Sequence, residues 1–285
     1  MSKRGMEPIT RHLSFQLDHG TAQRPAIGVI VLATDPTIEC ELRRLLPLDA
    51  VALYHSRIGN DQQINLESLK AMEGDITNCA ALLVPGMPLD VVAYGCTSAS
   101  VVMGEERVFG RIRAGRPGVE CTSPVTAALA AFEALDVSRI ALLAPYRSDI
   151  SQLVRDYIVA HGVEVPIMGT FDVEDDGVVA RMSEDTIVSA AIELGSHDDI
   201  DAVFISCTTL RASGIVAKIE SALDKPVTSS THALAWHCLR LAGVDTQFPR
   251  LGRLYTTALG SRCAQDGPSG ARSRAGPAAG DARMV

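Results

Sequence analysis

Tyr94-Gly95-Cys96-Thr97-Ser98 is the stretch that decides the fold, and Ser206-Cys207-Thr208-Thr209 repeats its pattern later in the chain. An apolar run precedes each cysteine, at 91–94 and at 202–205, and each run is typical of a buried strand. A helix is expected after each cysteine. Both thiols are therefore predicted where the carboxyl end of a strand turns into a helix, which is where open α/β sheets place ligands.

The spacing of two separate features indicates an internal duplication. Cys207 follows Cys96 by 111 residues, and the apolar run 138–144 follows the similar run 27–33 by the same interval. We therefore expect two similar α/β halves, each with one Cys-Thr loop. The two thiols would then act on opposite faces of one small substrate.

The composition limits the classes of protein that need to be considered. The chain has 285 residues, of which 47% are apolar and only 4% aromatic, and its formal net charge is −8. The low aromatic content and the negative net charge argue against nucleic acid or an anionic membrane as the main partner. No apolar run is long enough to span a bilayer, and the polar N-terminal segment has no secretory signal pattern.

The cysteine content favours free thiols. Seven cysteines are an odd number, and they form no Cys-x-x-Cys pair and no close His/Cys cluster. We therefore expect no disulfide framework and no metal site, and a cytoplasmic location. Cys79 is interpreted as a core residue, and Cys263 falls in a C-terminal segment rich in Gly, Ala, Ser, Arg and Pro.

Apolar periodicity and turn residues divide the chain into alternating strands and helices. Strands are expected at 27–32, 51–54, 91–94, 139–143, 163–171, 202–205 and 226–228. The predicted organisation has four parts: a polar extension at 1–25, a first α/β domain at 26–124 plus 226–260, a second α/β domain at 125–225, and a disordered tail at 261–285.

Two thiols in such turns could carry out proton transfer. The amino end of a helix favours a thiolate and is expected to lower its pKa from about 8.5. The neighbouring hydroxyls of Thr97, Ser98, Thr208 and Thr209, with free backbone N–H groups, could bind a carboxylate or an oxyanion. One thiolate could then attack a carbon or remove its proton while the other thiol donates a proton, without a metal or an organic cofactor.

Two further side chains are expected at strand ends. Asp35 follows the first strand, where it could cap the next helix or contact a ligand. Tyr146 lies 111 residues later, at the equivalent place in the second half. Its phenol could donate a hydrogen bond to a substrate oxygen, or it could be a packing group.

These motifs resemble a known superfamily. Over about residues 26–245 the chain is similar to the aspartate/glutamate racemase superfamily, to its maleate isomerase and arylmalonate decarboxylase branch, and most of all to the ectoine-utilisation proteins of that branch. The resemblance rests on four motifs in the order of the family: Tyr94-Gly95-Cys96-Thr97-Ser98, Leu142-Leu143-Ala144-Pro145-Tyr146, Ser206-Cys207-Thr208-Thr209-Leu210 and Ala233-Leu234-Ala235-Trp236.

The resemblance implies a fold and a set of roles. It implies two pseudo-symmetric, Rossmann-like α/β domains, each with a four-stranded parallel sheet flanked by helices, and an active site in the cleft between them. Cys96 would be the nucleophile or base, Cys207 the opposing acid or base, and Tyr146 a substrate-binding residue. A homodimer or higher homo-oligomer is expected.

The sequence departs from the maleate isomerase pattern at two positions. Asp35 stands where those enzymes carry an Asn that binds a substrate carboxylate, and Asp176 aligns with a second such Asn. Two like charges about 4 Å apart cost roughly 1 to 4 kcal/mol, so an anion at Asp35 would repel a dicarboxylate. We therefore expect a ligand with a cationic or hydrogen-bond-donating group, such as hydroxyectoine or a related zwitterion.

The sequence thus predicts a cofactor-independent isomerase or racemase that acts on a small carboxylate. Three alternatives remain open: a maleate cis-trans isomerase, an arylmalonate-type decarboxylase, and a non-catalytic metabolite-binding protein.

Overall fold

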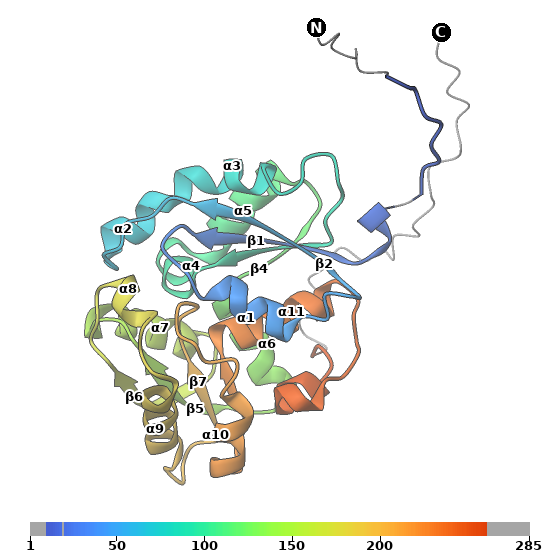
Figure 1. Cartoon of the computed structure of the whole chain (residues 1–285). Helices are drawn as coiled ribbons and strands as arrows, with labels where there is room; N and C mark the ends of the chain where they lie inside the picture. Colours follow the sequence, from blue (N-terminus) through green and yellow to red (C-terminus); the bar gives the residue numbers. More distant parts are fainter. Residues whose placement is uncertain (1–9, 19, 261–285) are drawn as a thin grey trace, which may run out of the picture.

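The protein contains two four-stranded sheets with parallel strands in the same order. The computed structural model describes residues 10–18 and 20–260, and Figure 1 shows its elements along the chain. The first sheet has the order β2-β1-β3-β4 and the second the order β6-β5-β7-β8, and every pairing of neighbouring strands is parallel. The predicted pair of similar α/β halves is confirmed. The strands are β1 (Ala26–Leu32), β2 (Ala52–Ile58), β3 (Val91–Gly95), β4 (Glu120–Thr122), β5 (Arg139–Ala144), β6 (Glu164–Thr170), β7 (Ala202–Ile205) and β8 (Val227–Ser229).

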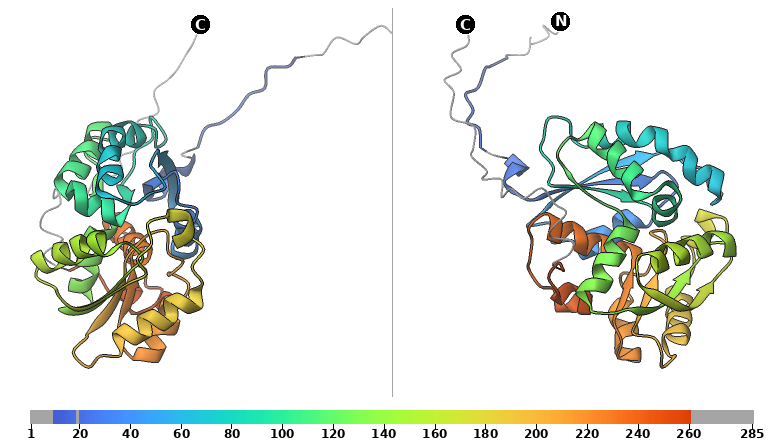
Figure 2. Two further views of the ribbon diagram at one scale, coloured as in Figure 1. Left: turned by 90° about the vertical axis from the view of Figure 1, so that its left-hand side faces the viewer. Right: turned by 180° about the vertical axis from the view of Figure 1, so that it is seen from behind.

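Helices flank both sheets. The α-helices are α1 (Ile38–Leu45), α2 (Leu66–Ala71), α3 (Ile76–Ala81), α4 (Thr97–Met103), α5 (Glu105–Gly115), α6 (Pro124–Ala134), α7 (Ser148–Ala160), α8 (Asp176–Val179), α9 (Glu184–Gly195), α10 (Val216–Leu223) and α11 (Ser230–Leu241). Figure 2 shows the two halves one above the other, with α6 and α11 at their junction. Both helices pack against each other, and α11 also contacts α1 and β3.

The structure corrects four details of the sequence interpretation. The three-residue strand β4 and the one-turn helix α8 were not predicted, and β2 continues to Ile58 instead of ending at Tyr54. Strand β8 belongs to the second sheet, although the segment 226–260 was assigned to the first domain. The domain boundaries otherwise stay a prediction. Parts of the expected extension (1–9 and 19) and the whole expected tail (261–285), with Cys263, lie outside the described residues.

The alternation of β1 explains how the first half is assembled. Ile27, Val29 and Val31 belong to one buried cluster, which also contains Trp236 of α11. Ile30 and Leu32 belong to a second cluster on the other side of the sheet. Gly28 allows close packing there, because a Cβ atom at this position would lie 2.9 Å from Leu83 Cδ1. Successive side chains of β1 therefore point to opposite faces of the sheet, and each set packs in a different buried cluster.

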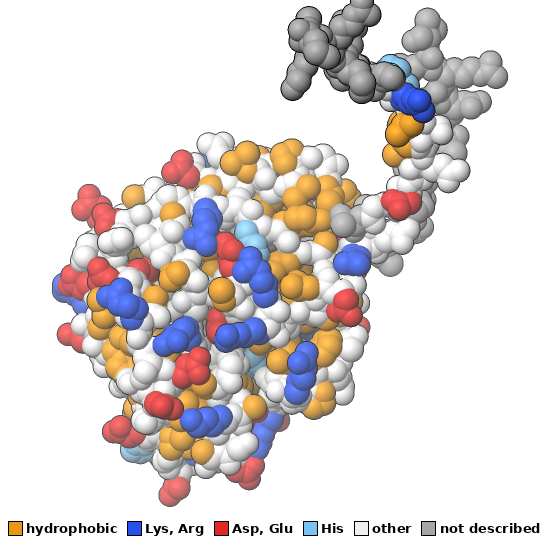
Figure 3. Space-filling view, viewed as in Figure 1, with side chains coloured by type: hydrophobic (Ala, Val, Ile, Leu, Met, Phe, Trp, Pro, Cys, Tyr) orange, Lys and Arg blue, Asp and Glu red, His pale blue; other side chains and the backbone are white. Residues whose placement is uncertain are grey.

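The surface carries charges of both signs. Figure 3 shows Lys and Arg side chains interspersed with Asp and Glu over the face it presents. Within the part of the chain that the structure describes, no helix combines the length and the apolar character needed to cross a bilayer. That nucleic acid and membranes are not partners stays a prediction.

Two buried histidines in α11 make the stability of the protein depend on pH. His232 Nδ1 lies 3.0 Å from Thr228 Oγ1, and His237 Nδ1 lies 2.8 Å from Thr122 Oγ1. Both rings are almost wholly buried, and burial lowers the pKa of each from 6.5 to about 4. Both histidines are therefore neutral in the folded protein at pH 6, and unfolding allows them to take up protons.

We expect His237→Asn to make the protein less sensitive to acid. The lowered pKa of His237 in the folded state contributes stability that is complete above pH 6.5 and is lost as the pH falls towards 4. The free energy of unfolding of the wild type, relative to that of the variant, should therefore fall by up to about 3 kcal/mol over this interval. Urea unfolding of both proteins at pH 7, 5.5 and 4.5 measures this difference. A difference that does not change with pH would contradict the account.

Candidate active site

Cys96 lies where β3 turns into α4, as predicted. It is the N-cap residue of α4, and its backbone is extended, with φ −143° and ψ 120°. Gly95 permits this position, since a Cβ atom there would come within 2.9 Å of both Ile30 O and Ile38 Cδ1. Glycine at this position thus allows β3 to pass close to β1 and α1 immediately before Cys96.

Cys207 follows β7, but no helix begins beside it, so that part of the prediction is wrong. Thr208 and Thr209 form a turn, and the next helix, α10, starts at Val216. The φ angle of Cys207 is 111°, which side-chain-bearing residues rarely adopt. Its N–H donates to Ser230 Oγ at 2.9 Å. The conformation of this turn therefore depends on a contact with α11.

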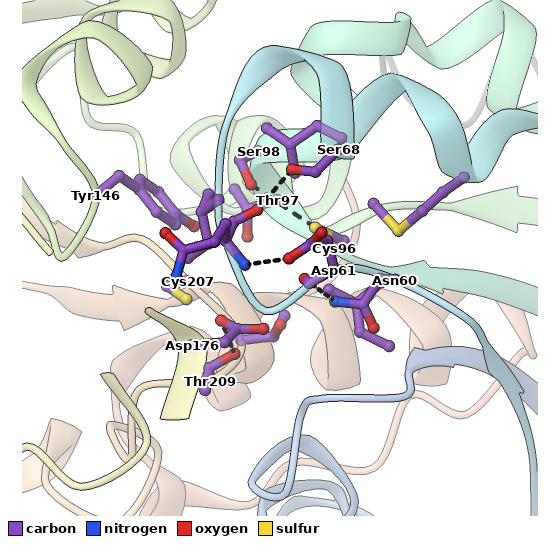
Figure 4. A pocket seen from close by; sticks show the side chains of 16 residues that line it. Asn60, Asp61, Ser68, Cys96, Thr97, Ser98, Tyr146, Asp176, Cys207 and Thr209 are labelled. Atoms are coloured by element: carbon purple, nitrogen blue, oxygen red, sulfur yellow. Dashed lines mark hydrogen bonds between the residues drawn. The ribbon is translucent and has the colours of Figure 1, made fainter. Parts of the chain in front are cut away.

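Both cysteines line one cavity, seen from close by in Figure 4. The cavity gathers eight of the nine residues predicted for the site: Cys96, Thr97, Ser98, Tyr146, Asp176, Cys207, Thr208 and Thr209. The first half supplies Cys96 from β3–α4, and the second half supplies Cys207 and Tyr146 from the ends of β7 and β5. The remaining lining residues are Leu32, Asn60, Asp61, Gln63, Ile64, Ser68, Leu69 and Met72.

Asp35 is the predicted residue that does not line the cavity. Its side chain is completely buried, and Oδ1 accepts hydrogen bonds from the N–H groups of Thr37 at 2.7 Å and Ile38 at 3.0 Å. This carboxyl therefore caps the start of α1. Oδ2 has no hydrogen-bond partner among the described residues. Burial raises the pKa of Asp35, and its charge in turn raises the pKa values of Cys96 and Cys207.

Asp176 lines the cavity and is held by hydroxyl groups from both halves. Thr34 donates to Oδ2 at 2.6 Å, and Thr209 donates to Oδ1 at 3.2 Å. Asn60 supports this arrangement, because its Nδ2 donates to Thr34 Oγ1 at 2.7 Å. Burial raises the pKa of Asp176, while the two hydroxyl donors favour its ionised form.

Sequence reasoning missed the loop that follows β2. Asn60 and Asp61 lie in this loop and line the cavity. A signal was present, because the loop follows the carboxyl end of a strand next to β1, where the ends of parallel strands converge. The expected strand was ended four residues too early, at Tyr54, so Asn60 and Asp61 were not placed at its end.

Two loops meet over the cavity and close it. Gln63 and Asp175 form an isolated antiparallel bridge, the N–H of Ile64 donates to Glu174 O at 2.9 Å, and the N–H of Asp176 donates to Gln62 O at 3.2 Å. The volume open to the centre of a water molecule is about 20 Å³, enough for roughly one water. The contacts between residues 60–65 and 174–176 therefore join the two halves beside the cavity.

A comparison with protein families shows the family to which the chain belongs. The profile of the arylmalonate decarboxylase family matches residues 46–255. The chain belongs to this family. It is 29% identical over 247 residues to a maleate isomerase of Pseudomonas putida, covering 81% of this chain and 97% of the relative. It is also 28% identical over 140 residues to an arylmalonate decarboxylase of Bordetella bronchiseptica, covering 48% and 58% of the two chains.

Solved structures of both kinds of relative share the fold. The maleate isomerase of Pseudomonas putida S16 superimposes with a TM-score of 0.74 at 25% identity, over 81% of this chain and 98% of that one. An unliganded arylmalonate decarboxylase superimposes with a TM-score of 0.68 at 26% identity, over 81% and 98%. The predicted membership in this branch of the superfamily is therefore confirmed, and the specific link to ectoine-utilisation proteins stays a prediction.

In this family member, burial decides the protonation of the thiols. Desolvation raises the pKa of Cys96 to about 12, although the Ala99 N–H and the Ser98 hydroxyl favour its thiolate. Desolvation also raises the pKa of Cys207, with a further increase from the charge of Asp176. The expectation that a helix amino end lowers both pKa values is therefore wrong for the closed, ligand-free site. The desolvation of two fully buried thiols outweighs the effect of α4 on Cys96, and no helix begins at Cys207.

The cavity of this family member has acidic but no basic side chains. Its lining includes Asp61 and Asp176, and no Lys or Arg is among the described residues that line it. Tyr146 is buried, and its pKa is raised well above 10 by desolvation, so its hydroxyl remains a hydrogen-bond donor at neutral pH. The site can thus donate hydrogen bonds from hydroxyls, exchange protons through two thiols and attract a positive charge.

Proposed function

We propose that this member of the arylmalonate decarboxylase family is a cofactor-independent isomerase or racemase that acts on a small carboxylate. The observation that supports the proposal most is that Cys96 and Cys207, supplied by different halves, line the same closed cavity. Both side chains are 5% exposed, so a bound ligand would be enclosed between two groups that can each hold or release a proton.

The proposed reaction moves one proton off a carbon and another onto it. One cysteine, as thiolate, takes the proton from the carbon next to the carboxylate, and the C–H electron pair passes into that carboxylate as an enolate. The other cysteine then donates its S–H proton to the opposite face of the same carbon. The two cysteines exchange protonation states, and the enzyme has neither gained nor lost a proton. The hydroxyls of Tyr146 and Ser98 are the proposed donors to the enolate oxygens.

We propose further that the substrate carries a cationic or strongly hydrogen-bond-donating group, as a zwitterion such as hydroxyectoine does. The carboxyls of Asp61 and Asp176 line the cavity, and Asp35 lies buried close enough to raise the pKa values of both thiols. A bound cation would stabilise the ionised carboxyls and would also favour the thiolate that the reaction needs. A dianion such as maleate would do the opposite.

Two alternatives have an observation in their favour. A maleate isomerase activity is favoured by the match to the Pseudomonas putida enzyme over nearly its whole length. A decarboxylase activity is favoured by the family profile itself. Neither explains Asp176, a buried carboxyl in the cavity, or the buried Asp35 beside it, when none of the described residues that line the cavity is Lys or Arg. A binding protein without catalysis would not require the opposed thiols.

A substrate panel separates these possibilities. The purified protein is incubated separately with hydroxyectoine, ectoine, free amino acids, maleate and an arylmalonate, and each mixture is followed by proton NMR and chiral chromatography. The Cys96→Ala/Cys207→Ala double variant is the blank. Inversion or isomerisation of a zwitterion supports the proposal. Formation of fumarate from maleate or loss of CO₂ from the arylmalonate would replace it, and saturable binding without turnover would favour a binding protein.

The raised thiol pKa values predict how the activity depends on pH. Catalysis needs one thiolate, and the pKa of Cys96 is about 12 in the ligand-free site. The thiolate fraction, and with it kcat/KM, should therefore rise about tenfold per pH unit between pH 6.5 and 8.5. Stopped-time assays in a buffer series of constant ionic strength measure the profile. A profile that is flat or falls over this range would show that neither free thiol titrates as described.

A further inference from the structure

Ser230 makes hydrogen bonds to both cysteine turns. It is the first residue of α11, its side chain is fully buried, and it is not one of the residues that line the cavity. Its Oγ accepts the N–H of Cys207 at 2.9 Å and lies 2.8 Å from Oγ1 of Thr97, the residue after Cys96. One hydroxyl thus joins the turn of one thiol to the turn of the other.

The turn at Cys207 needs such support. A φ of 111° at a residue with a side chain is strained and persists only when surrounding contacts hold it. Thr208, the next residue, donates from Oγ1 to Gly95 O at 3.2 Å, on the other side of the same junction. The two cysteine turns are therefore linked by two hydroxyl contacts, and only the one through Ser230 bonds the strained residue itself.

Starting α11 does not require the hydroxyl of Ser230. Ser229 already caps this helix, because its Oγ accepts the N–H of His232 at 3.2 Å. The equivalent helix of the first half, α6, begins in the same way after Ser123, whose Oγ caps Thr126, and its first residue is Pro124. The two halves thus share the capping serine and differ at the next position. A proline there has no hydroxyl, so the Ser230 contacts are a feature of the second half alone.

We infer that Ser230 is a positioning residue that sets the relative placement of the two thiols. Its Oγ accepts the N–H of Cys207 and shares a hydrogen bond with Thr97 Oγ1, so one hydroxyl contacts both turns. Loss of this hydroxyl releases the Cys207 turn from its strained conformation and removes the link to the Cys96 turn. The effect on catalysis rests on the proposed function, whereas the effect on the thiols themselves does not.

The kinetic test compares Ser230→Ala with Ser229→Ala. Alanine at the first position of a helix is compatible with α11, so the Ser230 variant should fold. We expect kcat on the substrate found by the panel to fall about 10- to 100-fold with little change in KM, because the reacting groups are displaced while the ligand contacts remain. Ser229→Ala loses the cap of the same helix but not the thiol link, and it should retain kcat. Equal losses of kcat in both variants would overturn the inference.

Thiol reactivity provides a test that does not require the substrate. The rates at which iodoacetamide modifies Cys96 and Cys207 are measured by peptide mass spectrometry in the intact, folded protein. We expect Cys207 to react about tenfold faster in Ser230→Ala than in the wild type, as its turn opens more often, and Ser229→Ala to react like the wild type.

Two variants of Thr97 keep the inference testable if Ser230→Ala does not fold. Thr97→Val removes the hydroxyl at the other end of the link with little change in shape, and Thr97→Ser restores it. Faster modification of Cys207 in the valine but not in the serine variant would support a connection between the turns. An unchanged Cys207 rate in Thr97→Val would show that the link through Ser230 does not position the two turns, whatever reaction the protein catalyses.

Discussion

Replacing either Cys96 or Cys207 by serine is expected to lower kcat by about 10³-fold, within the range of roughly 10²- to 10⁴-fold that a positioned acid or base contributes. Serine keeps the size and the hydrogen-bonding capacity of the side chain but has a much less acidic proton. Each variant should still bind the substrate, because the hydroxyls and carboxyls that line the cavity remain. The decreases in kcat should also not add in the Cys96→Ser/Cys207→Ser double variant, because removal of either group already prevents the step in which both take part.

A third buried cysteine supplies the matched control for these variants. Cys121 of β4 is also buried, and burial raises its pKa to about 11, but it does not line the cavity. Cys121→Ser should therefore leave kcat within about twofold of the wild type, as expected when a residue outside the reacting unit is changed. Retention of most of the activity in Cys96→Ser or Cys207→Ser would mean that the reaction needs only one thiol.

Replacing Asp35 and Asp176 together by asparagine is expected to exchange one substrate class for another. Asparagine preserves the acceptor oxygen that caps α1 and the acceptor that Thr209 or Thr34 uses, while the negative charge is removed. Opposite charges about 4 Å apart attract by roughly 1 to 4 kcal/mol, so we expect kcat/KM for a cation-bearing substrate to fall at least about tenfold when this attraction is lost. Inhibition or turnover of maleate should improve by a similar factor.

The neighbouring Asp175 provides the control for charge. Its Oδ1 caps α8 by accepting the N–H of Val178, and asparagine is an equally good capping residue. Asp175→Asn changes the net charge by the same amount per residue but does not alter the lining of the cavity. The measurement is the ratio of kcat/KM for the zwitterion to the affinity for maleate, taken as the reciprocal of its inhibition constant, in all variants. If Asp35→Asn/Asp176→Asn left this ratio unchanged, charge at these positions would not select the substrate.

The sequence predicted the parts of the site that depend on local patterns. Cys96 and Cys207 could be placed at strand ends because short apolar runs precede them, and the shared interval of 111 residues predicted the duplicated sheets. The strand β4 was missed because Glu120-Cys121-Thr122 is short and contains no apolar run that could distinguish a strand from a turn.

Long-range contacts explain why the remaining details were not predicted. The turn after Cys207 depends on Ser230, which lies 23 residues later, and its positive φ leaves no mark in the local sequence. Asn60 reaches the site through Thr34 and Asp176, and the loop 60–65 closes over the cavity by pairing with a segment more than 100 residues away. The thiol pKa values were predicted in the wrong direction because the extent of burial follows from both halves together.

The most direct test of two opposed thiols is the reaction of the identified substrate in D₂O, followed by NMR and chiral separation during the first few per cent of turnover. If one thiol removes a proton and the other donates from the opposite face, solvent deuterium should appear in the product while the unreacted substrate keeps its proton. Either single cysteine variant should lower kcat by about 10³-fold, as expected above. Equal early deuteration of substrate and product, or inversion at close to the wild-type rate in a single-cysteine variant, would contradict the account.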